Sequence, residues 1–177
     1  MKKQSERMAF SGMMTALAVV VMLMGGVIPL ATFVSPAVAG ILLIPVMVET
    51  GKRFALGAYG AIALLSLILG SDKESALLFA ALGYYPVLKV KLDSIRRAGL
   101  RLAAKLAVFN LAVAVVLLTA TLILNMEALA AEYAAMSGIM LAAFAILANL
   151  TMLLYDRALV VMLVAYVKKL RPRLKIR

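Results

Sequence analysis

Residues 106–124 read LAVFNLAVAVVLLTATLIL, without a single charged side chain. A helix of this length crosses a hydrocarbon core of roughly 30 Å. The run from Met13 to Met24 has the same character. Across the 177 residues, 66% are hydrophobic, 15% are charged and the mean hydropathy is +1.07. A soluble domain is about half apolar and about a quarter charged, so the sequence predicts an integral membrane protein.

Six apolar segments alternate with short stretches rich in glycine, proline or charge. They occupy residues 8–27, 34–48, 54–69, 75–90, 102–124 and 137–167. The last segment exceeds a perpendicular crossing, so we expect it to tilt or to extend beyond the lipid. Because proline obstructs the carbonyl one turn earlier, the segment containing Pro86 should kink or end near Leu82 to Gly83. No linker divides the segments, and we expect one all-α transmembrane domain, a six-helix bundle over residues 1–177.

The charges of the loops predict the orientation of this bundle. If the N-terminus is cytoplasmic, the cytoplasmic segments hold nearly all the basic residues: Lys2, Lys3, Arg7, Lys52, Arg53, Lys89, Lys91, Arg96, Arg97, Arg101, Lys105, Lys168, Lys169, Arg171, Arg173, Lys175 and Arg177. Lys73 falls on the outer side, and Arg157 lies within the last segment. The outer segments instead carry the acidic residues Asp72, Glu74, Glu127 and Glu132. Since basic residues stay on the cytoplasmic side, both termini are expected to be cytoplasmic.

The composition excludes several classes of function. The chain has no cysteine, histidine or tryptophan, so we expect no disulfide, no thiolate or imidazole metal site and no Cys–His or Ser–His catalytic arrangement. It has no P-loop motif, so we do not expect it to hydrolyse ATP itself. The net charge of +11 lies in short segments without a polar basic face, which argues against a nucleic-acid partner. We expect neither an enzyme nor a bound cofactor.

Polar residues inside the apolar segments need a partner or a purpose, because lipid does not solvate them. Asp156 and Arg157 lie within the last segment, and Asn149 shares the helical face of Asp156. One interpretation makes this face part of a substrate pathway or coupling surface. The interpretation we favour is an internal polar clamp between helices, with Arg157 reaching towards the cytoplasm. Asn110 and Tyr59 are expected to hydrogen-bond across the bundle.

Further polar groups are expected near the outer surface. Residues 70–75 read GSDKES, and their charges either bind a polar solute or form a solvated turn in which Asp72 caps the next helix. Tyr84 and Tyr85 lie in the kinked segment, where they either line a cavity or anchor at headgroup depth. Residues 125–133 are expected to form a short amphipathic lid or turn.

The first apolar segment carries a family resemblance. Gly12 and Ala16 place small residues at i, i+4 spacing on one helical face, which lets another helix approach closely. A short basic N-terminus leads into residues 9–18 (AFSGMMTALA), and glycine and proline mark the outer stretch 25–36. In these features, and in its six-segment hydropathy map, the chain resembles the substrate-binding S components of energy-coupling factor (ECF) transporters.

The resemblance implies partners and a site. In that family, two alanines at this spacing on the first helix pack against a transmembrane coupling protein; Gly12 and Ala16 match them, with glycine in place of one alanine. An ATPase pair completes the transporter, which takes up a vitamin or similar micronutrient across a bacterial cytoplasmic membrane. The solute is bound towards the outer side. The positions here that can reach that region are Asp72, Lys73, Glu74, Tyr84, Tyr85, Asn125, Glu127 and Tyr133.

Two other functions stand beside this one. The rod-shape membrane protein family shares this size and helix number and partners cell-wall synthesis enzymes, so the first alternative is a non-transporting scaffold. Such a scaffold would lack a ligand cavity, and Asp156 and Arg157 would serve contacts only. The second alternative is a self-contained small transporter or lipid flippase.

Overall fold

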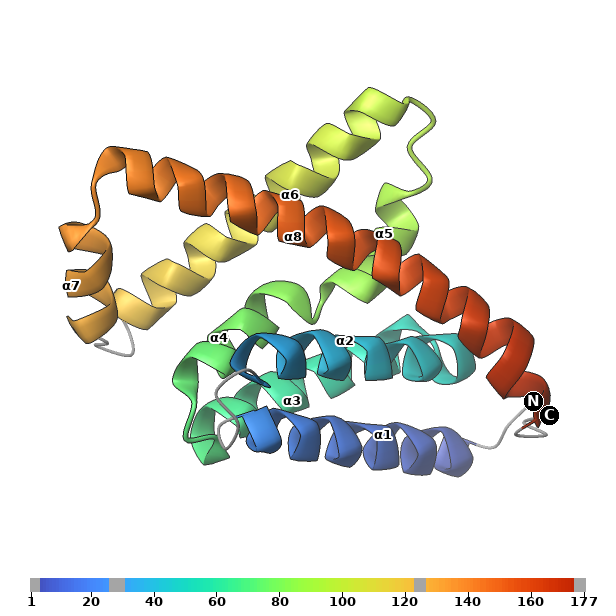
Figure 1. The fold of residues 1–177 in the computed structure, drawn as a ribbon. Coiled ribbons are helices and arrows are strands. Elements are labelled where there is room, and N and C mark those ends of the chain that lie inside the picture. The colour runs from blue at the N-terminus through green and yellow to red at the C-terminus, as the bar shows by residue number, and fades with distance from the viewer. Residues whose placement is uncertain (1–3, 26–30, 123–126, 174–177) are drawn as a thin grey trace. The chain divides into compact units, whose positions relative to one another are not determined.

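The computed structural model describes residues 4–25, 31–122 and 127–173, and every regular element within them is a helix (Figure 1). The elements are α1 (Gln4–Gly25), α2 (Ala31–Thr50), α3 (Lys52–Leu69), α4 (Lys73–Leu82), α5 (Tyr85–Leu92), α6 (Ala98–Leu122), α7 (Glu127–Ala135), α8 (Gly138–Ala165), the π-helix η1 (Tyr166–Leu170) and α9 (Arg171–Arg173). Within the described residues, six spans are long and apolar enough to cross a membrane; α4 with α5 makes one of them and α8 with η1 another. The predicted all-α fold with six candidate membrane spans is therefore confirmed.

The break between α4 and α5 lies where proline was expected to interrupt the helix. α4 ends at Leu82, and the N–H of Gly83 donates to the carbonyl of Phe79 at 2.7 Å. α5 begins at Tyr85, so Pro86 falls in its first turn, where a missing N–H loses no helical hydrogen bond. The predicted kink or end near Leu82 to Gly83 is confirmed.

Several other helix ends differ from the expected ones. α1 already begins at Gln4, and α2 begins at Ala31. Only Gly51 separates α2 from α3, and its φ of 96° lies in the left-handed region that glycine adopts without strain. The short helix α7 occupies Glu127–Ala135, so it overlaps the stretch 125–133, where a lid or turn was expected, and ends two residues beyond it. Such ends depend on local hydrogen bonds and backbone angles, which hydropathy does not report.

Contacts within the chain divide it into two units. The first comprises Met1–Lys91 with Ala158–Arg177, and the second comprises Leu92–Arg157. The chain passes from the first to the second unit after α5 has nearly ended and returns inside α8. Whether residues 1–177 form a single transmembrane domain stays a prediction.

The core of the first unit lies where α1, α2, α3 and α4 pack together (Figure 1). Its members recur at helical spacing: Ala18, Val19, Met22, Ala39, Leu43, Val46, Ala55, Ala58, Ile62, Phe79 and Val87. Small residues such as Ala55 and Ala58 let the helices approach closely, and van der Waals packing of this kind holds helices together in lipid. A buried hydrogen bond of 3.0 Å between the hydroxyls of Ser35 and Ser75 also joins α2 to α4. This packing fixes α1 and α3 side by side.

The second unit contains α6, α7 and the first part of α8, and its helices are far less covered by protein. In the apolar windows of α6 and α8, 11% of the residues are buried, against 61% in α4 with α5. Exposed residues include large apolar ones such as Leu111, Leu118 and Ile146. Exposed apolar surface of this extent is covered by lipid or by another protein when the chain is in a membrane.

Candidate functional site

A groove of about 420 Å³, here called the α1–α3 groove, runs between two helices of the first unit. It is lined by Ser11, Gly12, Thr15 and Ala16 of α1 and by Phe54, Gly57, Ala58, Ala61 and Leu65 of α3. Gly12 with Ala16, and Gly57 with Ala61, place small residues at i, i+4 spacing on each wall. At these four positions the walls therefore carry no bulky side chain that would keep another helix at a distance.

The two glycines show that the α1–α3 groove is open. A Cβ added at Gly12 or at Gly57 would meet no heavy atom of the described residues within 4 Å. Both positions are exposed in the chain, and so is Ala16. The pair expected to pack against a partner helix therefore lies on an accessible surface. Sequence analysis did not single out Gly57 and Ala61, although their spacing repeats that of Gly12 and Ala16 and could have revealed the second wall.

The turn between α3 and α4 uses its charged groups to close two helices. The carboxylate of Asp72 accepts a hydrogen bond from the backbone N–H of Ser75 at 3.1 Å and caps α4. The ammonium of Lys73 donates to the carbonyls of Leu67 and Gly70 at 2.6 and 2.9 Å, at the end of α3. Of the two interpretations of this turn, helix capping accounts for the hydrogen bonds of both charged side chains.

Tyr84 and Tyr85 occupy different environments. Tyr85 is fully buried, and the ammonium of Lys89, a residue that is 7% exposed, lies 6.0 Å from its ring centroid. Tyr84 is half-buried and meets the ring of Tyr59 edge-on, with 6.1 Å between the centroids. The hydroxyl of Tyr59 donates to the carbonyl of Ala80 at 2.8 Å and so joins α3 to α4. Tyr85 can therefore contact a solute only after its surroundings rearrange, whereas Tyr84 keeps part of its surface accessible.

The residues expected to bind a solute come from both units. The first unit contains Asp72, Lys73, Glu74, Tyr84 and Tyr85, and the second contains Glu127 and Tyr133, both on α7. Glu74, Glu127 and Tyr133 are exposed. Asn125 lies outside the described residues. The residues of the turn between α3 and α4 thus belong to one unit, and those of α7 belong to the other. Their joint role in solute binding stays a prediction.

A buried lysine organises the polar centre of the second unit. Lys105 on α6 is 7% exposed. Its ammonium lies 2.9 and 3.0 Å from the two carboxylate oxygens of Asp156 on α8, and 2.6 Å from a carboxylate oxygen of Asp93, which precedes α6. This contact joins two helices and favours the clamp interpretation of Asp156. Sequence analysis counted Lys105 among the loop charges and did not single out Asp93, although the position of Lys105 inside the apolar segment 102–124 was an available signal.

Arg157 does not share the environment of its neighbour. Asp156 is half-buried, whereas Arg157 is exposed in the chain. Successive residues of a helix point about 100° apart, so the helix that turns Asp156 towards Lys105 turns Arg157 away from it. Arg157 therefore lies on the protein surface, whereas Asp156 takes part in the contact between the two helices.

Asn110 and Asn149 join α6 to α8 through a reciprocal amide pair. The Nδ2 of Asn110 donates to the Oδ1 of Asn149 at 2.8 Å, and the Nδ2 of Asn149 donates to the Oδ1 of Asn110 at 3.2 Å. Each Nδ2 also donates at 2.8 Å to a carbonyl of its own helix, that of Leu106 or Ala145. The hydrogen bond that Asn110 was expected to make across the bundle is present, although the residue is exposed in the chain.

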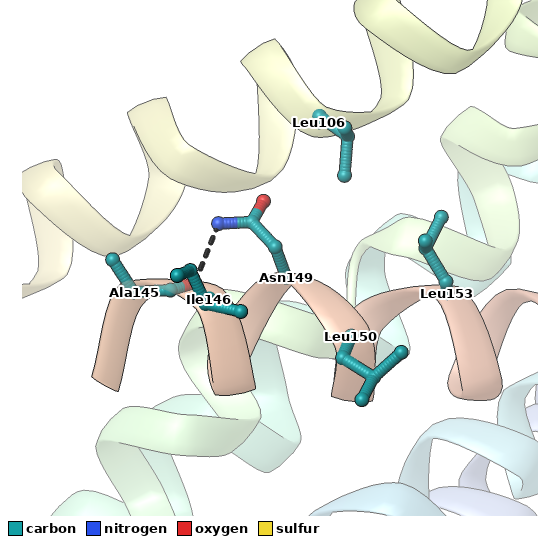
Figure 2. Close-up of a pocket in the computed structure, with 6 residues that line it drawn as sticks. All are labelled: Leu106, Ala145, Ile146, Asn149, Leu150 and Leu153. Atoms are coloured by element: carbon teal, nitrogen blue, oxygen red, sulfur yellow. Dashed lines mark hydrogen bonds between the residues drawn. The ribbon is translucent and has the colours of Figure 1, made fainter. Parts of the chain in front are cut away.

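A hollow of about 360 Å³ lies beside this amide pair. Figure 2 shows its lining residues together with the bond from Asn149 to Ala145: Leu106, Ala145, Ile146, Asn149, Leu150 and Leu153. Apart from Asn149, these side chains are apolar. Since both N–H groups of that amide are already engaged, the hollow offers a polar solute no side-chain donor of its own, and the amide pair fits a helix clamp.

A further polar contact closes the end of α2. The carboxylate of Glu49, with its side chain 3% exposed, lies 2.9 Å from the Nε of Arg171 and 3.4 Å from the hydroxyl of Tyr166. All three residues belong to the first unit. The contact joins the basic residues of η1 and α9 to α2, and it pairs the carboxylate of Glu49 with a cation of the same chain.

No protein-family model, curated protein or solved structure matches this chain. The choice of a candidate site therefore rests on geometry. The charged turn, the lysine–carboxylate contact and the amide pair serve contacts within the chain, whereas the α1–α3 groove presents open surface. Its walls, which consist mostly of small residues, can receive a transmembrane helix.

Proposed function

We propose that this chain is the membrane-embedded substrate-binding subunit of an uptake system of the ECF type. It works with a separate transmembrane coupling protein and an ATPase pair, and it performs no reaction itself. Its solute is a vitamin or a similar small micronutrient, carried across a bacterial cytoplasmic membrane. Both termini lie in the cytoplasm in this proposal, as the distribution of basic residues predicts.

The α1–α3 groove is the observation that carries this proposal. A subunit that associates with a coupling protein inside the membrane needs a surface on which helices can pack closely, because the hydrophobic effect does not drive helices together in lipid. Small residues provide such a surface. Gly12 and Ala16 are accessible on one wall, and Gly57 lies open on the other. The S-component resemblance assigns the first of these pairs to the same task.

Co-purification tests the role of the α1–α3 groove. The chain is co-produced with a tagged coupling protein and its ATPases, and the amount retained on the tag is measured. Gly12→Leu and Gly57→Leu should each reduce retention strongly, because leucine fills the space that a partner helix would occupy. Gly99→Leu is the matched control, since Gly99 is exposed, a Cβ there meets no heavy atom of the described residues within 4 Å, and it lies outside this groove.

Solute binding is tested separately. Small molecules extracted from the purified chain are identified by mass spectrometry, and the binding of each is then measured by calorimetry. The proposal expects one micronutrient-sized compound that binds without the coupling protein. If the chain retains no solute and the wild type does not associate with the coupling module, the proposal is overturned.

A non-transporting scaffold is the second candidate. The observation in its favour is that Asp72 and Lys73, two residues expected to bind solute, are engaged in helix capping. A scaffold would present the α1–α3 groove to a cell-wall enzyme instead. Association with such an enzyme, together with the absence of any bound solute, would favour it.

A further inference from the structure

Two polar groups of α1 lie close together, and one of them lacks a hydrogen-bond partner within the described residues. The Nε of Arg7 is buried and makes no hydrogen bond there. The other group is the hydroxyl of Ser11, which lines the α1–α3 groove and is 8% exposed. An unpaired buried polar group costs free energy wherever it occurs, and the cost is greatest in a membrane. A surface that leaves the Nε of Arg7 unpaired is therefore incomplete.

Both groups lie at one end of the α1–α3 groove. Arg7 stands one helical turn before Ser11 on the same face of α1. Phe54 lines the opposite wall, so Lys52 and Arg53, at the start of α3, belong to the same end. Both are exposed.

The electrostatic balance of this end is positive. The first turn of α3 adds the positive end of a helix dipole, and Gly51 provides no side-chain cap for it. Of the nearby acids, Glu49 is engaged by Arg171, and Glu6 is exposed and points about 100° away from Arg7. The groove thus ends in a surplus of cationic and donor groups.

We propose, on the premise of the function proposed above, that the coupling-protein helix entering the α1–α3 groove carries an acidic side chain that pairs with Arg7 and an oxygen that accepts from the Ser11 hydroxyl. The carboxylate compensates the guanidinium that the incoming helix would otherwise desolvate. The pairing also fixes the register of the helix, because small residues repeated along both walls do not by themselves prevent it from sliding.

The test measures the affinity of the full chain, in nanodiscs, for a purified coupling module of coupling protein and ATPase pair. Arg7→Glu should weaken the affinity about tenfold or more, because it places like charges together. Arg7→Lys should keep most of it, and Ser11→Ala should weaken it only a few-fold. Arg96→Glu is the control, since it makes the same charge change at an exposed position outside the groove. If Arg7→Glu does not fold, Arg7→Gln replaces it.

The outcomes separate this inference from the proposed function. If the wild type does not bind the module, both are overturned. If the wild type binds and Arg7→Glu behaves like Arg96→Glu, the acidic partner residue is overturned while the proposed function stands. A loss seen only in nanodiscs that contain phosphatidylglycerol would assign Arg7 to a lipid headgroup and overturn the inference. A loss in zwitterionic nanodiscs as well, reversed by a carboxylate-to-arginine change in the coupling protein, supports it.

Discussion

The ammonium of Lys105 lies between the carboxylates of Asp93 and Asp156, and the three groups depend on one another unequally. A charge within an apolar helix is tolerated when an opposite charge and hydrogen bonds replace water. The side chain of Asp156 is 13% exposed, whereas that of Asp93 is 42% exposed. If Lys105 is removed, water can therefore solvate the carboxylate of Asp93, but it can hardly reach that of Asp156.

Lys105→Met should destabilise the second unit, because it removes the ammonium that contacts both carboxylate oxygens of the half-buried Asp156. We expect a loss of about 3 kcal/mol in the free energy of unfolding, measured in mixed micelles. Asp93→Asn should cost about 1 kcal/mol or less, because the contact it breaks is partly exposed. The double change Lys105→Met with Asp156→Leu should recover most of the loss. Equal effects of Lys105→Met and Asp93→Asn would contradict the dominance of the Asp156 contact.

The amide pair shows what could be predicted at the scale of residues. The spacing of Asn149 and Asp156 correctly places both on one side of α8, where they meet Asn110 and Lys105 of α6. The sequence pattern could not predict the partners of Lys105. These partners depend on how two helices cross, and Asp156 is distant from Lys105 in the sequence. A periodicity argument fixes the face of a helix but not what that face meets.

At the scale of elements, the junction of α4 and α5 depends on glycine as much as on proline. A Cβ built at Gly83 would lie 2.6 Å from Cζ of the Phe79 ring and 2.9 Å from the carbonyl oxygen of Phe79. Phe79 is fully buried, so its ring has little room to move. The close approach that lets the chain turn at this point therefore requires a residue without a side chain.

Gly83→Ala should lower the free energy of unfolding by about 1–3 kcal/mol, the usual cost of overpacking. Gly60→Ala is the matched control, because Gly60 lies within α3 and a Cβ there meets no heavy atom of the described residues within 4 Å. It should be neutral or slightly stabilising, since alanine is the better helix former. Thermal unfolding in detergent compares the two variants. A Gly83→Ala protein as stable as the wild type would show that the junction relaxes freely.

The sequence predicted the helices better than the contacts between them. Hydropathy found all six candidate spans, and the chemistry of Pro86 located the break after α4. The sequence predicted a capping role for Asp72 but not for Lys73, because capping by Lys73 depends on where α3 ends. The second wall of the α1–α3 groove escaped attention because small residues are frequent in this chain, and their spacing acquires meaning only once α1 and α3 are known to be neighbours.

At the scale of the whole molecule, the distribution of charge and the proposed docking surface constrain each other. Arg7, Lys52 and Arg53 lie at the end of the α1–α3 groove where the positive-inside pattern puts the cytoplasm. An ATPase pair acts from the cytoplasmic side, so a coupling helix that meets this end is close to the subunits that drive it. The proposed partner contact therefore requires the predicted orientation.

Single cysteines measure that orientation directly, because the natural chain contains none. Ser71→Cys, at the turn between α3 and α4, should react with a membrane-impermeant maleimide added to intact cells. Arg96→Cys, between α5 and α6, should react only after the cells are opened, because its basic segment is predicted to lie on the cytoplasmic side. Both residues are exposed in the chain, so a difference in labelling reflects the side of the membrane rather than burial. The inverse pattern would place Arg7 outside the cell, where no ATPase-driven partner could reach it, and would remove the proposed docking of a coupling protein together with the orientation.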